Sequence, residues 1–400
     1  MKLTGKTIFI LGIAKFDGQF ESTSYTTAKY FARENDVYYV DYPYTWKDYF
    51  SQNGASLNKR KPYFSNNSDG LLESGIPRLK ILIVPPVLSI NFIPEGFFYR
   101  FLNKINERII AKRILKVINT LLHKEIIFIN SFNFHYPNVG PLLRPKLSVY
   151  HCVDPLVVDY DKKHGVISEN QIVLQSDLVV CTSRQLFVNK IGINKNTYFI
   201  PNAADLSLSS KALNPGLPVS DRLINIKKPI VGYFGNIERR IDFHLLSEVI
   251  KANKDKSFVF AGPVEKEYLP VDFMDMENVH FIGRIPYSEM PEVIKGFDVA
   301  IIPFKKDQFS ATIFPLKLFE YLGSGKPVVS TDFNLDLQEF TNNQIPYCSN
   351  ALEFTRALNE SIHEDNDQKL KSRLEIASNN TWEKRLSELD VLLNKFYIND

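Results

Sequence analysis

Residues 309–332 of this 400-residue chain have the sequence FSATIFPLKLFEYLGSGKPVVSTD. Proline is favoured at the first position of a helix, because the N–H that it lacks would have no partner there. Pro315 therefore predicts the start of a helix, which Gly323 and Gly325 end ahead of an apolar strand at 327–330. A helix followed by a wholly apolar strand is typical of an α/β unit whose parallel sheet is covered on both faces.

Lys317 and Glu320 lie near the start of this predicted helix. The first-turn N–H groups of a helix attract anions, so Lys317 would neutralise a phosphate there. Glu320, one turn in, would accept hydrogen bonds from a vicinal diol such as a ribose. The alternative is that the two residues form an ordinary i,i+3 pair on the surface.

A second informative stretch, residues 229–246, has the sequence PIVGYFGNIERRIDFHLL. Its strand leads into Gly235, which permits close backbone approach, and the turn that follows carries Arg239 and Arg240 before a helix near Asp242. Arginine binds phosphate oxygens bidentately. The turn is therefore a candidate diphosphate site, and simple surface charge is the alternative for both arginines.

A third stretch combines two strand ends. Gly262 ends the run FAGPV, and Pro286 and Tyr287 follow the strand in NVHFIGRIPYSEMPEVI. Loops of this kind, at the ends of neighbouring strands, would present backbone groups and an aromatic ring to a nucleotide base.

The alternation of apolar strands and helical patterns extends over the whole chain. Strands are expected at 6–13, 37–42, 79–84, 126–130, 147–153, 178–181, 198–200, 230–234, 257–261, 279–282, 299–303 and 327–330. Helices are expected at 23–35, 96–123, 165–175, 184–191, 242–253, 288–296, 315–323 and 381–397. The sequence therefore predicts an α/β protein with two doubly wound, Rossmann-like domains that face each other across a cleft.

The predicted domain boundaries follow the pattern. Residues 1–200 form the first domain, and 201–228, rich in Pro, Ser and Asn, form a linker. Residues 229–380 form the second domain, and 381–400 form a helix that crosses back to the first.

Charge divides the chain in the same way. Residues 1–200 carry 25 Lys and Arg against 16 Asp and Glu, whereas residues 201–400 carry 23 against 29. The whole N-terminal surplus lies within 53–146, which suggests an anionic partner near this stretch.

The three C-terminal stretches, in this order and spacing, resemble the donor-binding domain of the GT-B-fold, group 1-like glycosyltransferases of bacterial surface polysaccharide synthesis. The resemblance covers residues 229–332 well and implies that Glu320 holds the donor ribose, that Arg240 and Lys317 lie near the diphosphate, and that the loop at 285–287 lies near the base. The expected donor-binding residues are Gly235, Asn236, Arg239, Arg240, Gly262, Pro286, Tyr287, Thr312, Pro315, Lys317 and Glu320.

One position departs from the family pattern. Retaining members usually carry a second Glu eight positions before the helix Glu, with seven residues between the two, and this chain has Thr312 there. The departure puts a retaining mechanism in doubt and points to a divergent branch, similar to the teichuronic-acid and exopolysaccharide transferases.

An inverting transferase needs a general base beside the acceptor hydroxyl. Asp154, just past a predicted strand, is the first candidate and His151 is the alternate; both would otherwise be strand-end residues that cap the next turn. His135 is a weaker candidate, and Asp17 and Glu21, after the first strand, would bind acceptor hydroxyls.

No metal site and no cofactor other than the nucleotide-sugar co-substrate is expected. The triplet at 159–161 has the letters of a DxD motif without a convincing context, and relatives of this fold generally work without a bound metal. Free cysteines and the lack of a bilayer-spanning run favour a cytoplasmic protein.

The expected helix at 96–123 combines aromatic and basic residues, Phe97, Phe98 and Phe101 with Lys104, Arg108 and others. This composition suits a helix that rests on anionic lipid, and a core helix with a solvated basic face is the alternative. Nucleic acid is not expected as a partner, because no known binding module accompanies the charge.

The leading hypothesis is a metal-independent, hexosyltransferase-like enzyme that moves a sugar from a nucleoside-diphosphate sugar, with UDP favoured, to a carbohydrate or lipid-linked glycan. It would work in the cytoplasm, as a peripheral protein on the inner face of the plasma membrane. A non-hydrolysing nucleotide-sugar epimerase and a non-catalytic nucleotide-sugar-binding subunit are the alternatives.

Overall fold

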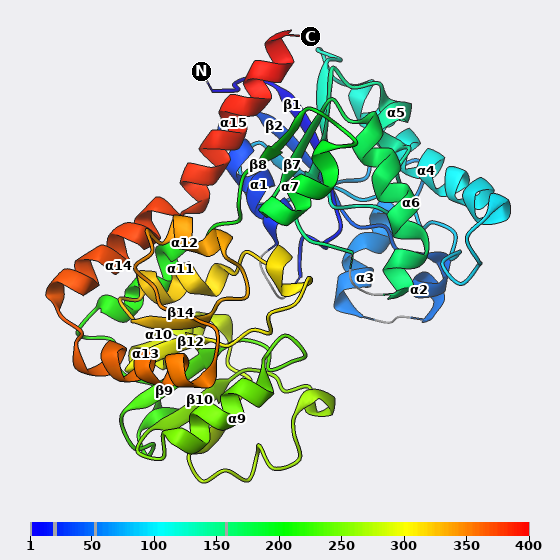
Figure 1. Cartoon of the computed structure of the whole chain (residues 1–400). Coiled ribbons are helices and arrows are strands. Elements are labelled where there is room, and N and C mark those ends of the chain that lie inside the picture. The colour runs from blue at the N-terminus through cyan, green and yellow to red at the C-terminus, as the bar shows by residue number, and fades with distance from the viewer. Residues whose placement is uncertain (1, 19–21, 52–53, 157–158, 400) are drawn as a thin grey trace. The chain divides into compact units, whose positions relative to one another are not determined.

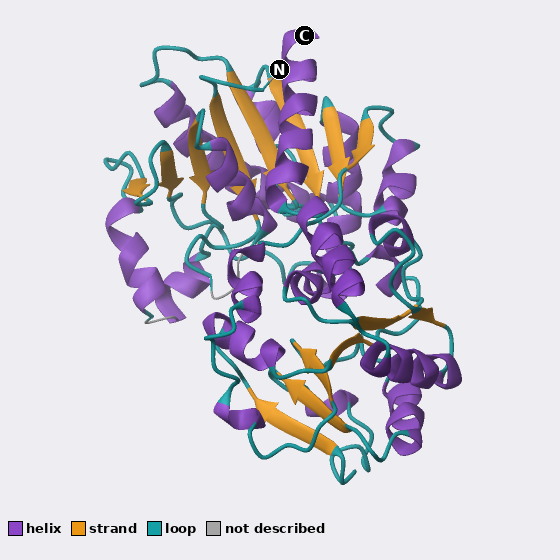
Figure 2. Cartoon of the chain, turned by 90° about the vertical axis from the view of Figure 1, so that its left-hand side faces the viewer, coloured by secondary structure: helices purple, strands orange, loops and turns teal. Residues whose placement is uncertain are grey.

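The computed structural model describes residues 2–18, 22–51, 54–156 and 159–399 (Figure 1). The chain divides into two compact units. Unit 1 contains Met1–Pro201 and Leu386–Asp400, and unit 2 contains Asn202–Arg385. Each is an α/β unit with helices on both faces of its sheet (Figure 2), so the predicted fold class is confirmed.

The described part of unit 1 contains one eight-stranded sheet in the order β3-β4-β2-β1-β5-β6-β7-β8. The strands are β1 (Thr7–Gly12), β2 (Asp36–Val40), β3 (Leu71–Glu73), β4 (Leu79–Leu82), β5 (Ile126–Ser131), β6 (Leu147–Cys152), β7 (Leu178–Cys181) and β8 (Thr197–Phe199). All neighbours are parallel except β3, which pairs antiparallel with β4 at the edge. The sequence did not predict this short strand.

The helices of unit 1 are α1 (Thr23–Phe31), α2 (Trp46–Ser51), α3 (Ala55–Arg60), α4 (Phe97–Ile118), α5 (Val139–Leu143), α6 (Asp159–Gln175) and α7 (Arg184–Ile191). Helix α15 (Trp382–Asn399) begins in unit 2, and from Leu386 onward it belongs to unit 1. There the carboxylate of Asp390 accepts a hydrogen bond of 2.7 Å from the N–H of Leu3.

The core of unit 1 explains which face of α4 is buried. Ile110, Ile114 and Val117 on this helix pack against Phe9 of β1 and Phe128 of β5. The helix ends at Ile118, five residues earlier than predicted, and Phe97, Phe98 and Phe101 at its other end are exposed. Arg113, a basic residue of the same helix, is buried and donates to the carbonyl of Ser68 over 2.7 Å.

The described part of unit 2 contains a six-stranded parallel sheet in the order β11-β10-β9-β12-β13-β14. The strands are β9 (Ile230–Phe234), β10 (Ser257–Ala261), β11 (Val279–Gly283), β12 (Val299–Ile302), β13 (Val328–Thr331) and β14 (Tyr347–Cys348). Because the chain runs outward from β9 to β11 and then returns to β12 on the other side of β9, the topological switch point lies between β9 and β12.

The helices of unit 2 are α8 (Leu206–Ser209), α9 (Phe243–Ala252), α10 (Met290–Lys295), α11 (Leu316–Gly323), α12 (Asp336–Phe340), α13 (Ala351–His363) and α14 (Asp367–Asn379). One hydrophobic core joins these helices to the sheet. The stretch predicted as an irregular linker, 201–228, contains α8 and the 3-10 turns Ser210–Leu213 and Asp221–Leu223. Apolar residues of this stretch such as Leu223 enter that core, which its Pro- and Ser-rich composition did not reveal.

Candidate functional site

The candidate site lies at the carboxyl edge of the sheet of unit 2, around the switch point between β9 and β12. Ligands of doubly wound sheets bind at such a point, because the loops on its two sides diverge. The residues predicted from three separate stretches all lie in the loops at this edge or in the first turns of α11.

Two glycines shape the loop after β9. Gly235 has φ +139° and Gly262, at the end of β10, has φ +153°, so both adopt backbone conformations that other residues rarely adopt. A Cβ atom on Gly262 would lie 2.0 Å from the carbonyl oxygen of Gly235, and a Cβ atom on Gly235 would lie 2.6 Å from Nζ of Lys317. The absence of side chains thus lets the Lys317 ammonium approach the backbone of this loop.

Lys317 is a cation in a mostly aromatic setting. Its Nζ atom donates a hydrogen bond of 2.7 Å to the hydroxyl of Tyr233 and lies 4.0 Å from the centre of that ring. Burial, together with the smaller effect of the positive charge of Arg240, lowers the pKa of Lys317 to about 7. An anion bound here would therefore favour the protonated form.

The two arginines of the turn after β9 adopt different positions. Arg240 forms an ion pair with Glu238, and its guanidinium lies 5.5 Å from the ring of Phe304 in the loop after β12. Arg239 is exposed and lies 5.2 Å from the ring of Phe309 in the same loop. The cations of this turn thus lie against the loop on the far side of the switch point.

Glu320 is connected to the loop after β11. The hydroxyl of Tyr287 donates a hydrogen bond of 2.5 Å to its Oε1 atom, and Pro286 precedes Tyr287 at the start of a 3-10 turn. Tyr287 is 43% exposed. The contact brings together the residues that the sequence assigned to the ribose and to the base.

Three other expected donor residues have mainly backbone roles. The carbonyl of Asn236 accepts a hydrogen bond of 2.9 Å from Tyr233, and Pro315 lies at the N-cap of α11, one position before the helix that it was predicted to open. Thr312 is buried and donates to the carbonyl of Phe309 over 2.6 Å. Thr312 therefore cannot supply the charge of the carboxylate that retaining relatives carry at this position.

Sequence reasoning missed Tyr321. Its hydroxyl accepts a hydrogen bond of 2.8 Å from the N–H of Phe234 and donates one of 3.2 Å to the carbonyl of the same residue. Strands β9 and β12 pair only at Val299 and Ala300, so the end of β9 has no ladder partner on this side among the described residues. A buried Tyr in an apolar helix resembles an ordinary core residue, and only its position next to Glu320 was a signal.

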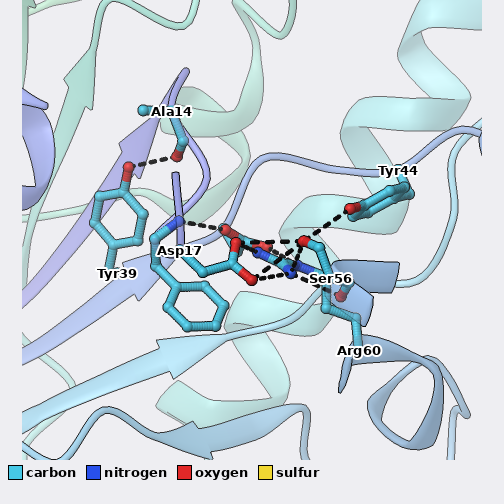
Figure 3. A network of polar contacts seen from close by, with 8 residues as sticks. Ala14, Asp17, Tyr39, Tyr44, Ser56 and Arg60 are labelled. Carbon is cyan, nitrogen blue, oxygen red and sulfur yellow. Dashed lines mark hydrogen bonds and ion pairs between the residues drawn. The ribbon is translucent and has the colours of Figure 1, made fainter. Parts of the chain in front are cut away.

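In unit 1 the predicted acceptor residue Asp17 belongs to a polar network (Figure 3). Arg60, fully buried, binds both carboxylate oxygens of Asp17 at 2.6 and 2.8 Å and donates to Asp41 over 2.6 Å. Asp41 also accepts from the N–H of Phe16 over 3.0 Å. The network fixes the loop after β1, so Asp17 has at least a structural role, and Glu21 lies outside the described residues.

The two acids that bind Arg60 have pKa values shifted in opposite directions. Hydrogen bonds from Arg60 lower the pKa of Asp17, whereas burial raises the pKa of Asp41 despite the same partner. The sequence gave no sign of Arg60, because its partners are 19 and 43 positions away.

The candidate bases of unit 1 differ in exposure. His151 is buried in β6, and burial lowers its pKa to about 4, so the ring is neutral at pH 7. Asp154 is exposed two residues beyond the strand. His135, in the loop after β5, lies 4.4 Å from the ring of Phe134, and burial lowers its pKa to about 4 as well. Asp154 is thus the accessible carboxylate among the three candidates.

Two cavities in unit 2 lie away from this edge. One of about 580 Å³ is lined by Lys251, Lys256 and His280, near the amino ends of β10 and β11. The other, of about 370 Å³, is lined by Gln344, Asp365 and Arg373. Neither contains a residue that the sequence or the switch point singles out.

The model of the family described as glycosyl transferases group 1 matches residues 228–364, which include every predicted donor-binding residue. The chain is 25% identical over 270 residues to the putative teichuronic acid biosynthesis glycosyltransferase TuaH of Bacillus subtilis strain 168. That match covers 62% of this chain and 66% of TuaH, slightly less than two thirds of its length.

Solved structures share the fold over the whole chain. Sucrose-phosphate synthase of Thermosynechococcus elongatus matches with a TM-score of 0.65 at 14% identity and covers 99% of this chain and 100% of its own. Anabaena HepE in complex with UDP matches with a TM-score of 0.63 at 17% identity, over 98% of this chain and 100% of its own. The α,α-trehalose-phosphate synthase of Burkholderia vietnamiensis matches with a TM-score of 0.68 at 8% identity, over 100% of both chains.

Proposed function

We propose, because residues 228–364 match the model of the group 1 glycosyl transferases, that this chain transfers a sugar from a nucleoside-diphosphate sugar to a carbohydrate acceptor. The observation that carries the proposal is the position of Lys317, whose ammonium lies against Gly235 at the switch point, one helical turn from Glu320. A cation and a carboxylate at this spacing fit a diphosphate and a ribose.

Within the donor site, each group has a distinct task. Lys317, Arg240 and the N–H groups at the start of α11 would neutralise the diphosphate. Glu320 would accept hydrogen bonds from the ribose hydroxyls while Tyr287 holds its carboxylate in place. UDP is the favoured nucleotide, since HepE, which shares the fold, forms complexes with UDP and UDP-glucose.

For the chemical step, we assign Asp154 as the general base. Its carboxylate would take the proton of the acceptor hydroxyl as that oxygen attacks the anomeric carbon, and the nucleoside diphosphate would leave with the electron pair of the broken bond. The negative charge that develops on the leaving group would be stabilised by Lys317 and Arg240 without a metal ion. Thr312, which supplies no carboxylate, is consistent with an inverting reaction.

The acceptor and the cellular role follow from the relative. The name of TuaH assigns it to teichuronic acid biosynthesis, so a cell-surface polysaccharide or its lipid-linked precursor is the acceptor class that we propose, with unit 1 as its binding unit. The three free cysteines are buried and fit a cytoplasmic site of synthesis.

A thermal-shift screen of UDP-, GDP-, dTDP- and CMP-sugars tests the donor site, because a ligand that binds only the folded state raises the melting temperature. Glu320→Ala should abolish the shift, whereas Glu248→Ala, at an exposed glutamate of α9, should leave it unchanged. An unchanged shift for Glu320→Ala would remove this residue from the site. Release of an epimerised nucleotide sugar without acceptor would instead identify an epimerase.

The general base is tested separately. Asp154→Asn should abolish transfer and preserve nucleotide binding, and wild-type turnover of this variant would exclude the assignment. His151→Asn provides the comparison for the alternate candidate.

A further inference from the structure

The surface of unit 1 carries a group of exposed phenylalanines. Phe92, Phe97, Phe98 and Phe101 are 77%, 88%, 61% and 53% exposed, and they occupy the first turns of α4 and the loop before it. We call these four residues the aromatic patch. Single exposed apolar side chains are common on proteins, but several that lie together on the surface mark an interaction site.

The aromatic patch continues into a row of positive charge on the same helix. Lys104, Arg108 and Lys112 are exposed and follow Phe97 and Phe101 at spacings of three and four residues, so they share one helical face. The one acidic residue of α4, Glu107, is buried and accepts hydrogen bonds from Asn138. The exposed face of this helix is therefore aromatic at one end and purely cationic along the rest.

Helix α6 contacts the residues that surround the aromatic patch. The ring of His164 stacks on Tyr99 at 3.5 Å and its Nδ1 atom lies 2.7 Å from Glu95, while Arg100 donates to Ser168 over 2.7 Å. Lys163 donates to the carbonyl of Phe92 over 3.2 Å. These contacts connect the loop before α4, the start of α4 and the first half of α6.

Helix α6 also extends the surface. Beside these contacts it exposes Val166 and Ile167, at 47% and 54%, and the charged Lys162 and Lys163. These residues of α6 are apolar or basic, as are the exposed residues of α4.

We propose that this surface docks the protein on an anionic lipid bilayer. The phenylalanines would enter the boundary between headgroups and acyl chains, and the row of Lys104, Arg108 and Lys112 would lie over anionic headgroups. Charge complementarity selects this occupant: the exposed charges of α4 have a single sign and adjoin exposed apolar rings, and an anionic bilayer offers an anionic headgroup layer next to an apolar one. None of the helices in the described part of the chain is long and apolar enough to span a bilayer, so the contact would be peripheral.

Co-sedimentation with vesicles tests the proposal. The full-length protein is mixed with vesicles of phosphatidylglycerol and phosphatidylcholine in equal amounts, and with vesicles of phosphatidylcholine alone. Wild-type protein should bind the anionic vesicles much more strongly, and binding should fall as salt rises. Absence of binding to either vesicle would overturn the proposal.

Two variants separate the contributions. Phe97→Ser/Phe98→Ser/Phe101→Ser should weaken binding about tenfold or more, and Lys104→Glu/Arg108→Glu should weaken it by more than about twentyfold, since each basic side chain near the surface contributes about fivefold. The matched controls are Leu352→Ser, an exposed leucine of α13, and Lys251→Glu/Lys254→Glu, two exposed lysines near the end of α9. Equal losses in variants and controls would overturn the proposal.

The same proteins are assayed for thermal stabilisation by UDP, which depends on unit 2. Retained stabilisation together with lost vesicle binding supports the docking surface independently of the proposed transferase function. Concentration-dependent dimerisation that the phenylalanine variant abolishes, with vesicle binding unchanged, would assign the aromatic patch to a second copy of this chain instead. RNA is also added to the vesicle-bound protein, in an amount that carries the same total charge as the lipid. If RNA displaces the wild-type protein, and the phenylalanine variant binds RNA as tightly as wild type does, the surface would be assigned to nucleic acid.

Discussion

The hydroxyl of Tyr287 donates a hydrogen bond of 2.5 Å to Oε1 of Glu320 and so connects the loop after β11 to the second turn of α11. The carboxylate that we assign to the donor ribose is thereby oriented before any ligand arrives. Preorganisation of this kind reduces the entropy that is lost on binding.

Tyr287→Phe should weaken UDP binding about fivefold, because one hydrogen bond contributes about 1 kcal/mol. Titration calorimetry measures the change, and with 2′,3′-dideoxy-UDP the difference between wild type and variant should vanish. Tyr347→Phe is the matched control, since the hydroxyl of Tyr347 lies 3.0 Å from that of Thr341, at the edge strand β14 of unit 2. Equal affinities of wild type and Tyr287→Phe for UDP would show that Glu320 does not need this partner.

Nucleotide binding should take up a proton above pH 7. The pKa of Lys317 is about 7 in the free protein, and a bound diphosphate raises it by favouring the charged form. Calorimetry at pH 8 in two buffers of different ionisation enthalpy should detect the uptake, and Lys317→Gln should abolish it. Lys251→Gln, at an exposed lysine of α9, should not.

The same pKa affects stability in a defined direction. The pKa of Lys317 is near 10.5 in the unfolded chain and about 7 in the folded one, so between these values the unfolded state binds more protons. Unfolding free energy should therefore rise with pH from 7 to 10.5, relative to Lys317→Gln. Denaturant titrations at both ends of this range measure the slope, and parallel curves for the two proteins would contradict the assignment.

Gly262→Ala should destabilise unit 2 by more than about 2 kcal/mol, because a left-handed backbone and a severe clash combine. Its Cβ atom would lie 2.0 Å from the carbonyl oxygen of Gly235, where no flexible side chain can move aside. Gly192→Ala is the control, since open space surrounds that position. Chemical denaturation compares them, and a neutral Gly262→Ala would show that the loop after β9 can move.

The two aspartates that bind Arg60 should differ in their effect on stability. Asp41→Ala leaves a buried guanidinium with one acidic partner and should cost about 3 kcal/mol. The side chain of Asp17 is 24% exposed, so Asp17→Ala should lower the unfolding free energy by only about 1 kcal/mol. Neither change should alter UDP binding. Loss of transfer by Asp17→Ala at full stability would support the predicted acceptor role of Asp17.

Sequence predicted most of the strands and the loops that follow β9, β10 and β11, because apolar runs and glycines act locally. Gly235, Lys317 and Glu320 could be singled out within single stretches, and the resemblance to the group 1-like transferases implied their roles. Helices α2 and α3 have only six residues each, too few for a helical period to be visible.

Contacts between distant positions could not be foreseen. Arg60 appeared as one more basic residue in a basic stretch, although it is fully buried between two acids. Likewise nothing in the local sequence distinguished Phe97, at the exposed end of α4, from Ile110, in its buried middle. Which residues of a helix are buried depends on where the sheet lies against it in the folded protein.

The hydroxyl of Tyr321 has a mechanical consequence. It hydrogen-bonds both the N–H and the carbonyl of Phe234, in the place of a neighbouring strand. Tyr321 belongs to the same helix as Lys317 and Glu320. Any shift of that helix away from the strand would leave two backbone groups without a partner. Helix α11 is thus held to the sheet at the switch point, where β9 and β12 separate.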